Sequence, residues 1–167
     1  QGLIGGCLVD VLMAHKGRNY NVYASGRNEE RAGRRFLKYA DDNAFHFVKY
    51  DVAQPLEYDV NFQYIIHAAS GAYPEEFIKH PVEVIKGNIN GLDNLMGYGI
   101  QHGIKRLLYI SSGEVYGEGD GRVFTENYSG YVDCTSLRSC YPSSKRAAET
   151  LCISYGCLLY TSDAADD

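Results

Sequence analysis

The residues with the clearest chemical potential are Tyr141 and Lys145, in the segment Tyr141-Pro142-Ser143-Ser144-Lys145. Four residues apart on a helix, their side chains lie on the same face, one turn apart. A free tyrosine has a pKa of about 10 and is a poor base at neutral pH, but a neighbouring ammonium group favours the phenolate. The pair could exchange a proton with a substrate hydroxyl. Because the chain has 15 tyrosines, the spacing alone carries little weight.

A hydroxyl group that could assist this pair follows an apolar segment. The strand expected over residues 106–112 ends in Ser111-Ser112, and open α/β sheets bind ligands at the carboxyl ends of their strands. Ser112 would donate a hydrogen bond to the oxygen of a reacting carbon. An ordinary turn residue is the other interpretation.

The chain begins with glycines that could hold a dinucleotide. At Gly2-Leu3-Ile4-Gly5 the backbone can approach a pyrophosphate, and the helix that follows, expected to about Lys16, offers N–H groups at its N-terminus. Gly2 and Gly5 would be the last two glycines of a fingerprint whose first glycine precedes this sequence. An ordinary turn that opens a helix is the alternative.

The end of the next expected strand leaves the choice between NAD and NADP open. A carboxylate that binds the ribose of NAD is usual there, but this chain has Ala24-Ser25-Gly26-Arg27. Ser25 and Arg27 could accept the 2′-phosphate of NADP. Arg27 could equally be a solvated residue in a basic stretch.

Strand-like and helix-like segments alternate along the chain, which is typical of a parallel α/β sheet with crossover helices. Strands are expected over residues 21–25, 44–51, 63–69 and 106–112, and helices over residues 28–39, 81–102 and 141–155. A polar loop covers residues 117–140. The sequence predicts a Rossmann-type doubly wound parallel sheet within one partial NAD(P)-binding domain, residues 1–156.

Both ends depart from this pattern. No strand precedes the glycine turn, so we expect the first strand, which belongs in the centre of the sheet, and a C-terminal substrate domain to lie outside this sequence. Residues 157–167 continue neither the apolar stripe nor a turn, and we interpret them as a non-native tail. Little or no activity is expected from residues 1–167 alone.

Composition excludes several classes of function. The net charge of -5 argues against a surface that binds nucleic acid or anionic lipid. No apolar run is long enough to cross a bilayer, and the sequence does not open with a signal-peptide pattern. The five cysteines show no CxxC or Cys/His spacing. We therefore expect reduced thiols, no metal site and a cytoplasmic protein.

Six motifs in a fixed order resemble those of the extended short-chain dehydrogenase/reductases of the NAD-dependent epimerase/dehydratase type. The resemblance runs from Gly2 to about Tyr155, and the shared order is far more specific than any one motif. The motifs are the Gly2/Gly5 turn, Asp51-Val52, Ile66-His67-Ala68-Ala69, Asn88-Ile89-Asn90-Gly91, Ser112-x-Glu114-Val115-Tyr116-Gly117 and Tyr141-x-x-x-Lys145.

The resemblance implies a role for each position. Tyr141 would take a proton from a sugar hydroxyl while hydride leaves the same carbon, with Lys145 and Ser112 assisting. Glu114 would act in the later chemistry, as in dehydratases and decarboxylases; a surface acid is the alternative. The cofactor would be contacted or positioned by Gly2, Gly5, Asp51, Val52, Ala68, Ala69, Asn88, Tyr141 and Lys145. Asn88 would help to hold a water beside Lys145, and Ala68 and Ala69 would pack beside the nicotinamide ribose.

Within the family, the chain is most similar to the UDP-glucuronate decarboxylases. The similarity lies in Arg138-Ser139-Cys140-Tyr141 and in residues 51–56, 126–130 and 145–151. Gly113 and Pro142-Ser143-Ser144 depart from that group's pattern. A nucleotide-sugar 4-epimerase and a 4,6-dehydratase therefore stay open as alternatives. Arg27 and the missing carboxylate at the end of the second strand leave an NADP-dependent carbonyl reductase open as well.

The resemblance also implies a substrate and partners. These are a UDP-linked nucleotide sugar that passes through a transient 4-keto form, NAD as a regenerated cofactor with NADP possible, and a homodimeric full-length protein.

Overall fold

Parallel strands form two pairs in the computed structural model, which describes residues 2–71 and 73–163. β1 (Val22–Gly26) pairs with β2 (Phe45–Lys49), and β3 (Tyr64–His67) pairs with β4 (Arg106–Tyr109). Each pair forms its own two-stranded sheet. All strands are parallel to their partners, as the sequence predicts for crossover connections.

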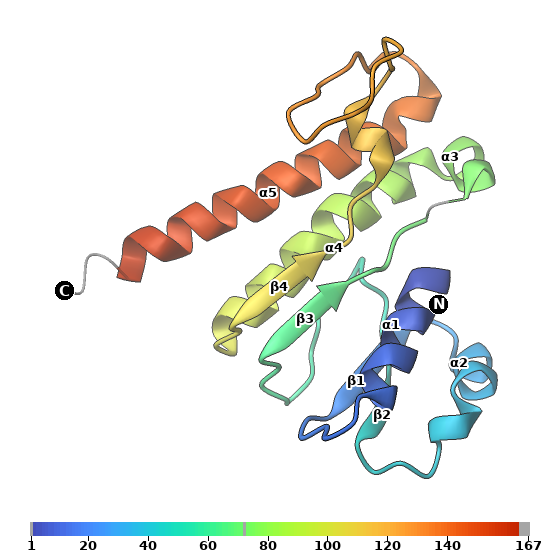
Figure 1. Ribbon diagram of the computed structural model, residues 1–167, viewed down its shortest axis with the longest axis vertical. Helices are drawn as coiled ribbons and strands as arrows, with labels where there is room; N and C mark the ends of the chain where they lie inside the picture. Colours follow the sequence, from blue (N-terminus) through green and yellow to red (C-terminus); the bar gives the residue numbers. More distant parts are fainter. Residues whose placement is uncertain (1, 72, 164–167) are drawn as a thin grey trace.

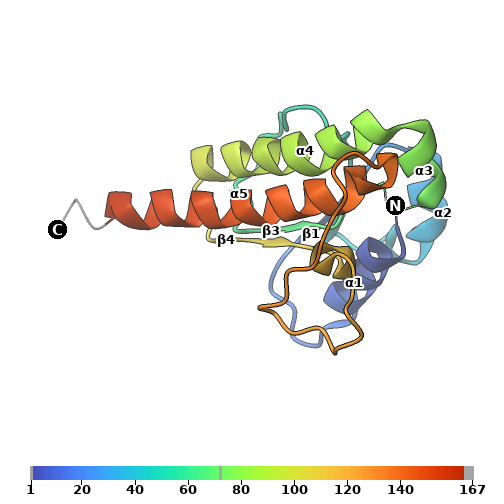
Figure 2. The same ribbon diagram turned by 90° about the horizontal axis from the view of Figure 1, so that it is seen from above.

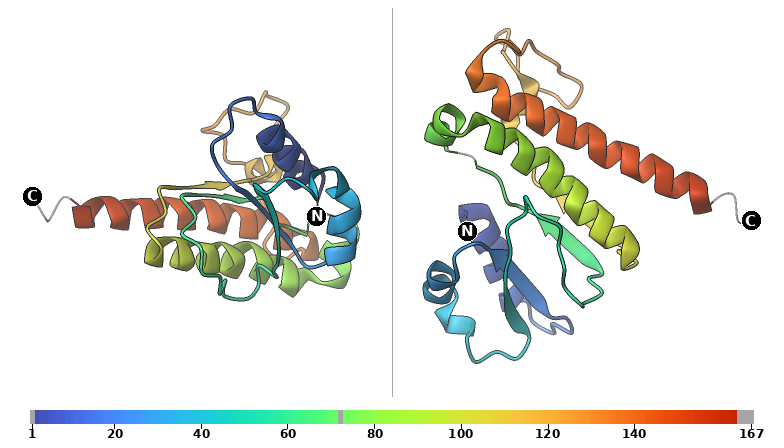
Figure 3. Two further views of the ribbon diagram at one scale, coloured as in Figure 1. Left: turned by 90° about the horizontal axis from the view of Figure 1, so that it is seen from below. Right: turned by 180° about the vertical axis from the view of Figure 1, so that it is seen from behind.

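Helices cover the strands on both sides. α4 (Pro81–Gln101) and α5 (Cys140–Asp163) lie side by side on one face of β3 and β4, while α1 (Leu3–Ala14) lies on the opposite side of the strands (Figures 1 and 2). The view from behind shows the same pairing of α4 with α5 (Figure 3). The Rossmann-type α/β prediction is confirmed.

The start of α1 lies against the end of β3. α1 begins beside the C-terminal end of β3, because a Cβ atom placed on Gly5 would lie 3.8 Å from the Cβ of Ala68. The same helix packs on β1.

Side chains along β3 and β4 point alternately towards the helices α4 and α5 and towards the opposite face, which no helix covers among the described residues. His67 and Tyr109 are register partners, and they face the helices α4 and α5. Ile66 and Leu108 point to the other side, where they are 37% and 54% exposed. Among the described residues, no helix covers this second face of β3 and β4.

The helix expected over residues 28–39 is broken. α2 (Glu29–Arg35) is capped by Asn28, whose side chain accepts a hydrogen bond from the Arg31 N–H at 2.7 Å, and a 3-10 turn, η1 (Leu37–Tyr39), follows. The break lies at Phe36, whose backbone leaves helical geometry as its ring enters the core beside Ala24 and Ala32.

Three short helices lie where the sequence predicts a strand end or irregular chain. They are α3 (Pro74–Lys79), η2 (Gly113–Tyr116) and η3 (Leu137–Ser139). β4 accordingly ends at Tyr109 rather than at residue 112, since the chain turns into η2 at Ser112.

α5 is longer than predicted, since it continues past Tyr155 to Asp163. No proline interrupts it, and Gly156 is the only strongly unfavourable residue in this extension. The first residues of the expected non-native tail are thus helical, while residues 164–167 lie outside the described residues. None of the helices described is both long and apolar enough to cross a membrane.

Candidate active site

Tyr141 and Lys145 are buried in the first turns of α5, at the C-terminal end of β4. Lys145 is only 2% exposed, and its Nζ atom donates a 2.8 Å hydrogen bond to the carbonyl oxygen of Ile110. The same Nζ lies 4.5 Å from the centroid of the Tyr109 ring and 5.8 Å from that of Tyr141. The ammonium group is thus held between the strand end and the candidate base.

Burial sets the charge state of this region. It lowers the pKa of Lys145 to about 8, while the nearby Glu149 acts in the opposite direction. Burial, and then the positive charge of Lys145, lower the pKa of His67 to about 4. His67 is therefore neutral at neutral pH, and the ammonium faces no second cation from β3.

Asn88 ties three elements together with its side chain. Its Oδ1 accepts a 2.8 Å hydrogen bond from Ser70, which follows β3, and its Nδ2 donates at 2.9 Å to the hydroxyl of Ser144 on α5. Ser144 donates in turn to the carbonyl oxygen of Cys140 at 2.6 Å. Asn88 and Ser144 are both buried. This network fixes the turn of α5 that carries Tyr141.

Ser112 precedes η2 and Glu114 lies on it, and η2 packs against α5. The Oγ atom of Ser112 caps η2 by accepting a 3.3 Å hydrogen bond from the Glu114 N–H, so its own hydrogen is available to a substrate. The carboxylate of Glu114 forms an ion pair with Arg138. The two candidate residues are thus positioned by one short turn.

The glycine turn fits the approach of a dinucleotide. A Cβ atom on Gly2 would meet nothing within 4 Å, and Gly2 precedes the N-terminal turn of α1, where N–H groups point outward. Gly5 lies against Ala68, while Ala69 is exposed beyond it. Gly5 and Ala68 therefore meet at the edge where α1 begins, and the open space at Gly2 leaves room for a dinucleotide.

The ends of β1 and β2 bring together a second group of candidate residues. Arg27 is exposed and Asp51 is partly buried, with Nη1 and Oδ2 3.9 Å apart, and Ser25 is exposed nearby on β1. Val52 instead packs on α4, where its carbonyl oxygen accepts a 3.1 Å hydrogen bond from Asn94. Its side chain lies close to Gly91, where a Cβ atom would come within 2.8 Å of it.

Several residues that build the site were missed by the sequence-based reasoning. Phe77 of α3 stacks on Tyr141 with ring centroids 4.8 Å apart. Arg146 donates to the carbonyl oxygens of Val115 at 2.6 Å and Gly130 at 2.9 Å, which holds the 117–140 loop against α5. The proline at the start of α3 was the one local signal for the helix that carries Phe77.

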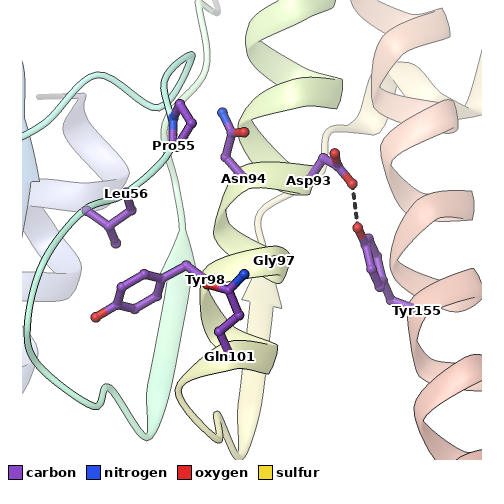
Figure 4. A pocket seen from close by; sticks show the side chains of 8 residues that line it. All are labelled: Pro55, Leu56, Asp93, Asn94, Gly97, Tyr98, Gln101 and Tyr155. Atoms are coloured by element: carbon purple, nitrogen blue, oxygen red, sulfur yellow. Dashed lines mark hydrogen bonds between the residues drawn. The ribbon is translucent and has the colours of Figure 1, made fainter.

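A pocket beside the C-terminal half of α4, bordered by Tyr155 of α5, lies away from these residues. It is lined by Pro55, Leu56, Asp93, Asn94, Gly97, Tyr98, Gln101 and Tyr155 (Figure 4). Tyr155 donates a hydrogen bond to Asp93 across it, which raises the pKa of Tyr155 to about 12. The pocket contains none of the candidate catalytic residues. The described residues also include no cluster of His, Cys, Asp or Glu that could hold a metal ion.

Among curated proteins, UDP-glucuronic acid decarboxylase 1 of Danio rerio is similar in sequence to this chain. The two are 33% identical over 156 residues, and the aligned region covers 92% of this chain and 35% of that protein. The chain thus spans about a third of the length of this relative.

Solved structures share the fold at lower identity. The dTDP-glucose 4,6-dehydratase of Bacillus anthracis, in complex with NAD, matches with a TM-score of 0.70 and 21% identity over 92% of this chain and 47% of that one. The UDP-glucose 4-epimerase of Thermotoga maritima, with UDP-glucose, matches with a TM-score of 0.69 and 21% identity over 92% and 48%. At this identity the likeness shows the fold alone.

The sequence profile of the NAD dependent epimerase/dehydratase family matches residues 1–158, which is nearly the whole chain. The fold, the order of the motifs and this match agree, and the chain belongs to the NAD dependent epimerase/dehydratase family.

Proposed function

We propose that the full-length protein with this chain is an NAD-dependent enzyme that oxidises C4 of a UDP-sugar, and that it is a UDP-glucuronate decarboxylase. The observation that carries the proposal is the burial of Tyr141 and Lys145 at the end of β4, with Ser112 on the adjoining turn. The name of the Danio rerio relative supports the choice of substrate.

The residues at the glycine turn would bind NAD. Gly2 and Gly5 would admit the pyrophosphate at the start of α1, and Ala68 and Ala69 would border the nicotinamide ribose. Bound NAD would supply a hydride acceptor that is regenerated within one catalytic cycle. Arg27 is exposed at the end of β1 and is the side chain that could instead favour NADP.

The side chains of the site have distinct roles in this chemistry. Tyr141 would accept the proton of the sugar C4 hydroxyl, and the positive charge of Lys145 would favour its phenolate. Ser112 would donate a hydrogen bond to the oxygen as it becomes a carbonyl. Phe77 and Asn88 would keep the Tyr141 ring and the first turn of α5 in place.

The later steps follow from the substrate. A ketone at C4 lies beta to a carboxylate on C5, so the C5–carboxyl bond can break with loss of carbon dioxide, leaving its electron pair in an enolate at C4 and C5. Protonation at C5 and return of hydride to C4 would complete the reaction. Glu114 lies next to Ser112 on η2 and is our candidate for the C5 proton transfer.

The direct experiment supplies the full-length protein with NAD and UDP-glucuronate. Release of carbon dioxide with formation of a UDP-pentose supports the decarboxylase. Conversion to the C4 epimer without release of carbon dioxide would instead identify a 4-epimerase, the activity named for the Thermotoga maritima structure. Consumption of NADPH with a simple ketone, and inertness towards nucleotide sugars, would contradict the proposal and favour a carbonyl reductase.

A further inference from the structure

Arg138 lies at the candidate site but has no part in the proton transfer proposed above. Its guanidinium group forms an ion pair with Glu114 and lies over the Phe77 ring, 4.6 Å from the ring centroid. The Phe77 ring stacks on Tyr141, with centroids 4.8 Å apart. The guanidinium group and the ring of the proposed catalytic base thus both contact the Phe77 ring.

Phe77 fixes where this cation lies. Its ring is buried in a cluster with Val84, Cys140 and Tyr141. A guanidinium group is attracted to the face of an aromatic ring, and this ring cannot move without disturbing the core. Arg138 is nonetheless 49% exposed, so its donors remain accessible from solvent.

The ion pair with Glu114 shows which kind of group Arg138 accepts. The planar guanidinium has five N–H donors, and their spacing matches the two oxygens of a carboxylate. Glu114 is 39% exposed, and ion pairs between exposed partners contribute little to stability. A second carboxylate could therefore share Arg138 or displace Glu114 from it at small cost.

We propose that Arg138 is a specificity-determining residue that binds the carboxylate of a uronate sugar, with Glu114 as its partner when substrate is absent. The inference rests on the proposed function, because the C4 hydroxyl of the sugar must reach Tyr141. In a uronate the carboxylate is attached to C5, adjacent to C4, so the two groups project from the same end of the sugar. A neutral hexose offers a hydroxyl group there and gains no charge interaction with Arg138.

The test compares the binding of a charged and a neutral nucleotide sugar by calorimetry. The full-length protein with NAD bound carries Tyr141→Phe to prevent turnover, and UDP-glucuronate and UDP-glucose are titrated separately. Arg138→Met retains most of the side-chain length without the charge. Arg138→Lys retains the charge without the planar fork. Arg122→Met is the matched control, since Arg122 pairs with Asp120 in an exposed part of the loop.

The expected result is a selective loss. Arg138→Met should weaken binding of UDP-glucuronate by roughly tenfold or more and change binding of UDP-glucose less than about twofold, with Arg138→Lys in between. Arg122→Met should change neither. Retained binding of UDP-glucose would also show that the variants are folded.

Two results would overturn the inference while leaving the proposed function intact. An equal loss for both nucleotide sugars would make Arg138 a structural residue, and no loss for either would place it outside the substrate contacts. Failure of the proposed function would give a third result. The Tyr141→Phe protein with Arg138 intact would then bind neither nucleotide sugar, and this inference would be wrong as well.

Discussion

The Nζ atom of Lys145 donates a 2.8 Å hydrogen bond to the carbonyl oxygen of Ile110, which fixes the start of α5 to the end of β4. If Lys145 left this position, the carbonyl oxygen of Ile110 would lose this donor. The bond thus connects the stability of the fold with the placement of the proposed catalytic pair.

Lys145 should give stability a characteristic pH dependence. Burial lowers its pKa from 10.5 to about 8 in the folded chain, so the unfolded chain binds more protons between these values. As the pH rises through this window, the wild-type chain should gain about 3 kcal/mol of unfolding free energy relative to Lys145→Met. Urea unfolding of both proteins at several pH values measures the difference. A difference that does not change with pH would contradict the burial of the ammonium group.

Removal of the Asn88 side chain should lower the unfolding free energy by more than the net contribution of its hydrogen bonds, because their buried partners stay behind. Asn88→Ala leaves the buried Ser144 hydroxyl without its donor and Ser70 without its acceptor, and should lower the unfolding free energy by about 1–3 kcal/mol. Combining it with Ser144→Ala should cost less than the sum of the two single changes. Chemical denaturation of the four proteins measures this coupling. Strictly additive losses would show that the two side chains do not interact.

Gly91 and Gly87 form a matched pair on α4. A Cβ atom on Gly91 would come 2.8 Å from Val52, whereas one on Gly87 would meet nothing within 4 Å. Gly87→Ala should stabilise the chain by about 0.5–1 kcal/mol through helix propensity. Gly91→Ala should destabilise it and weaken NAD binding to the full-length protein, because Val52 must move. Thermal unfolding and NAD titration distinguish the two variants. Equal effects of Gly87→Ala and Gly91→Ala would show that the Val52 side chain can move away without loss of stability.

Local patterns predicted the parts of this molecule that depend on local geometry. The i, i+4 spacing placed Tyr141 and Lys145 on one helical face, and the existence of β4, though not its end at Tyr109, followed from its apolar residues. The break in the helix at Phe36 could not be predicted from local pattern, because the Phe36 ring is buried against Ala24 of β1, a separate element.

Contacts between distant segments could not be predicted in the same way. Phe77 reaches Tyr141 only because α3 and α5 meet in the fold, and the Glu114–Arg138 ion pair joins two ends of a loop with no regular pattern. Asn88 was expected to hold a water beside Lys145. In the structure its side chain bonds to Ser70 and Ser144.

Residues 1–167 alone should not turn over substrate. Ile66 and Leu108 are exposed on the uncovered face of β3 and β4, and the chain spans about a third of its Danio rerio relative. Contacts to the nucleotide sugar are therefore expected from the rest of the protein. Release of carbon dioxide and formation of a UDP-pentose by equal amounts of this chain and of the full-length protein provide the comparison. Comparable turnover by the shorter chain would show that the expectation is wrong.

The central claim is that Tyr141 is the base that starts the reaction. The most direct measurement is a single turnover of the full-length protein with NAD and UDP-glucuronate, followed by the transient absorbance of NADH. Tyr141→Phe should slow NADH formation by about 10²–10⁴-fold, because the proton acceptor is lost. Binding of NAD should change little, because the phenylalanine ring at position 141 can still stack on Phe77. An unchanged rate of NADH formation in Tyr141→Phe would contradict the account.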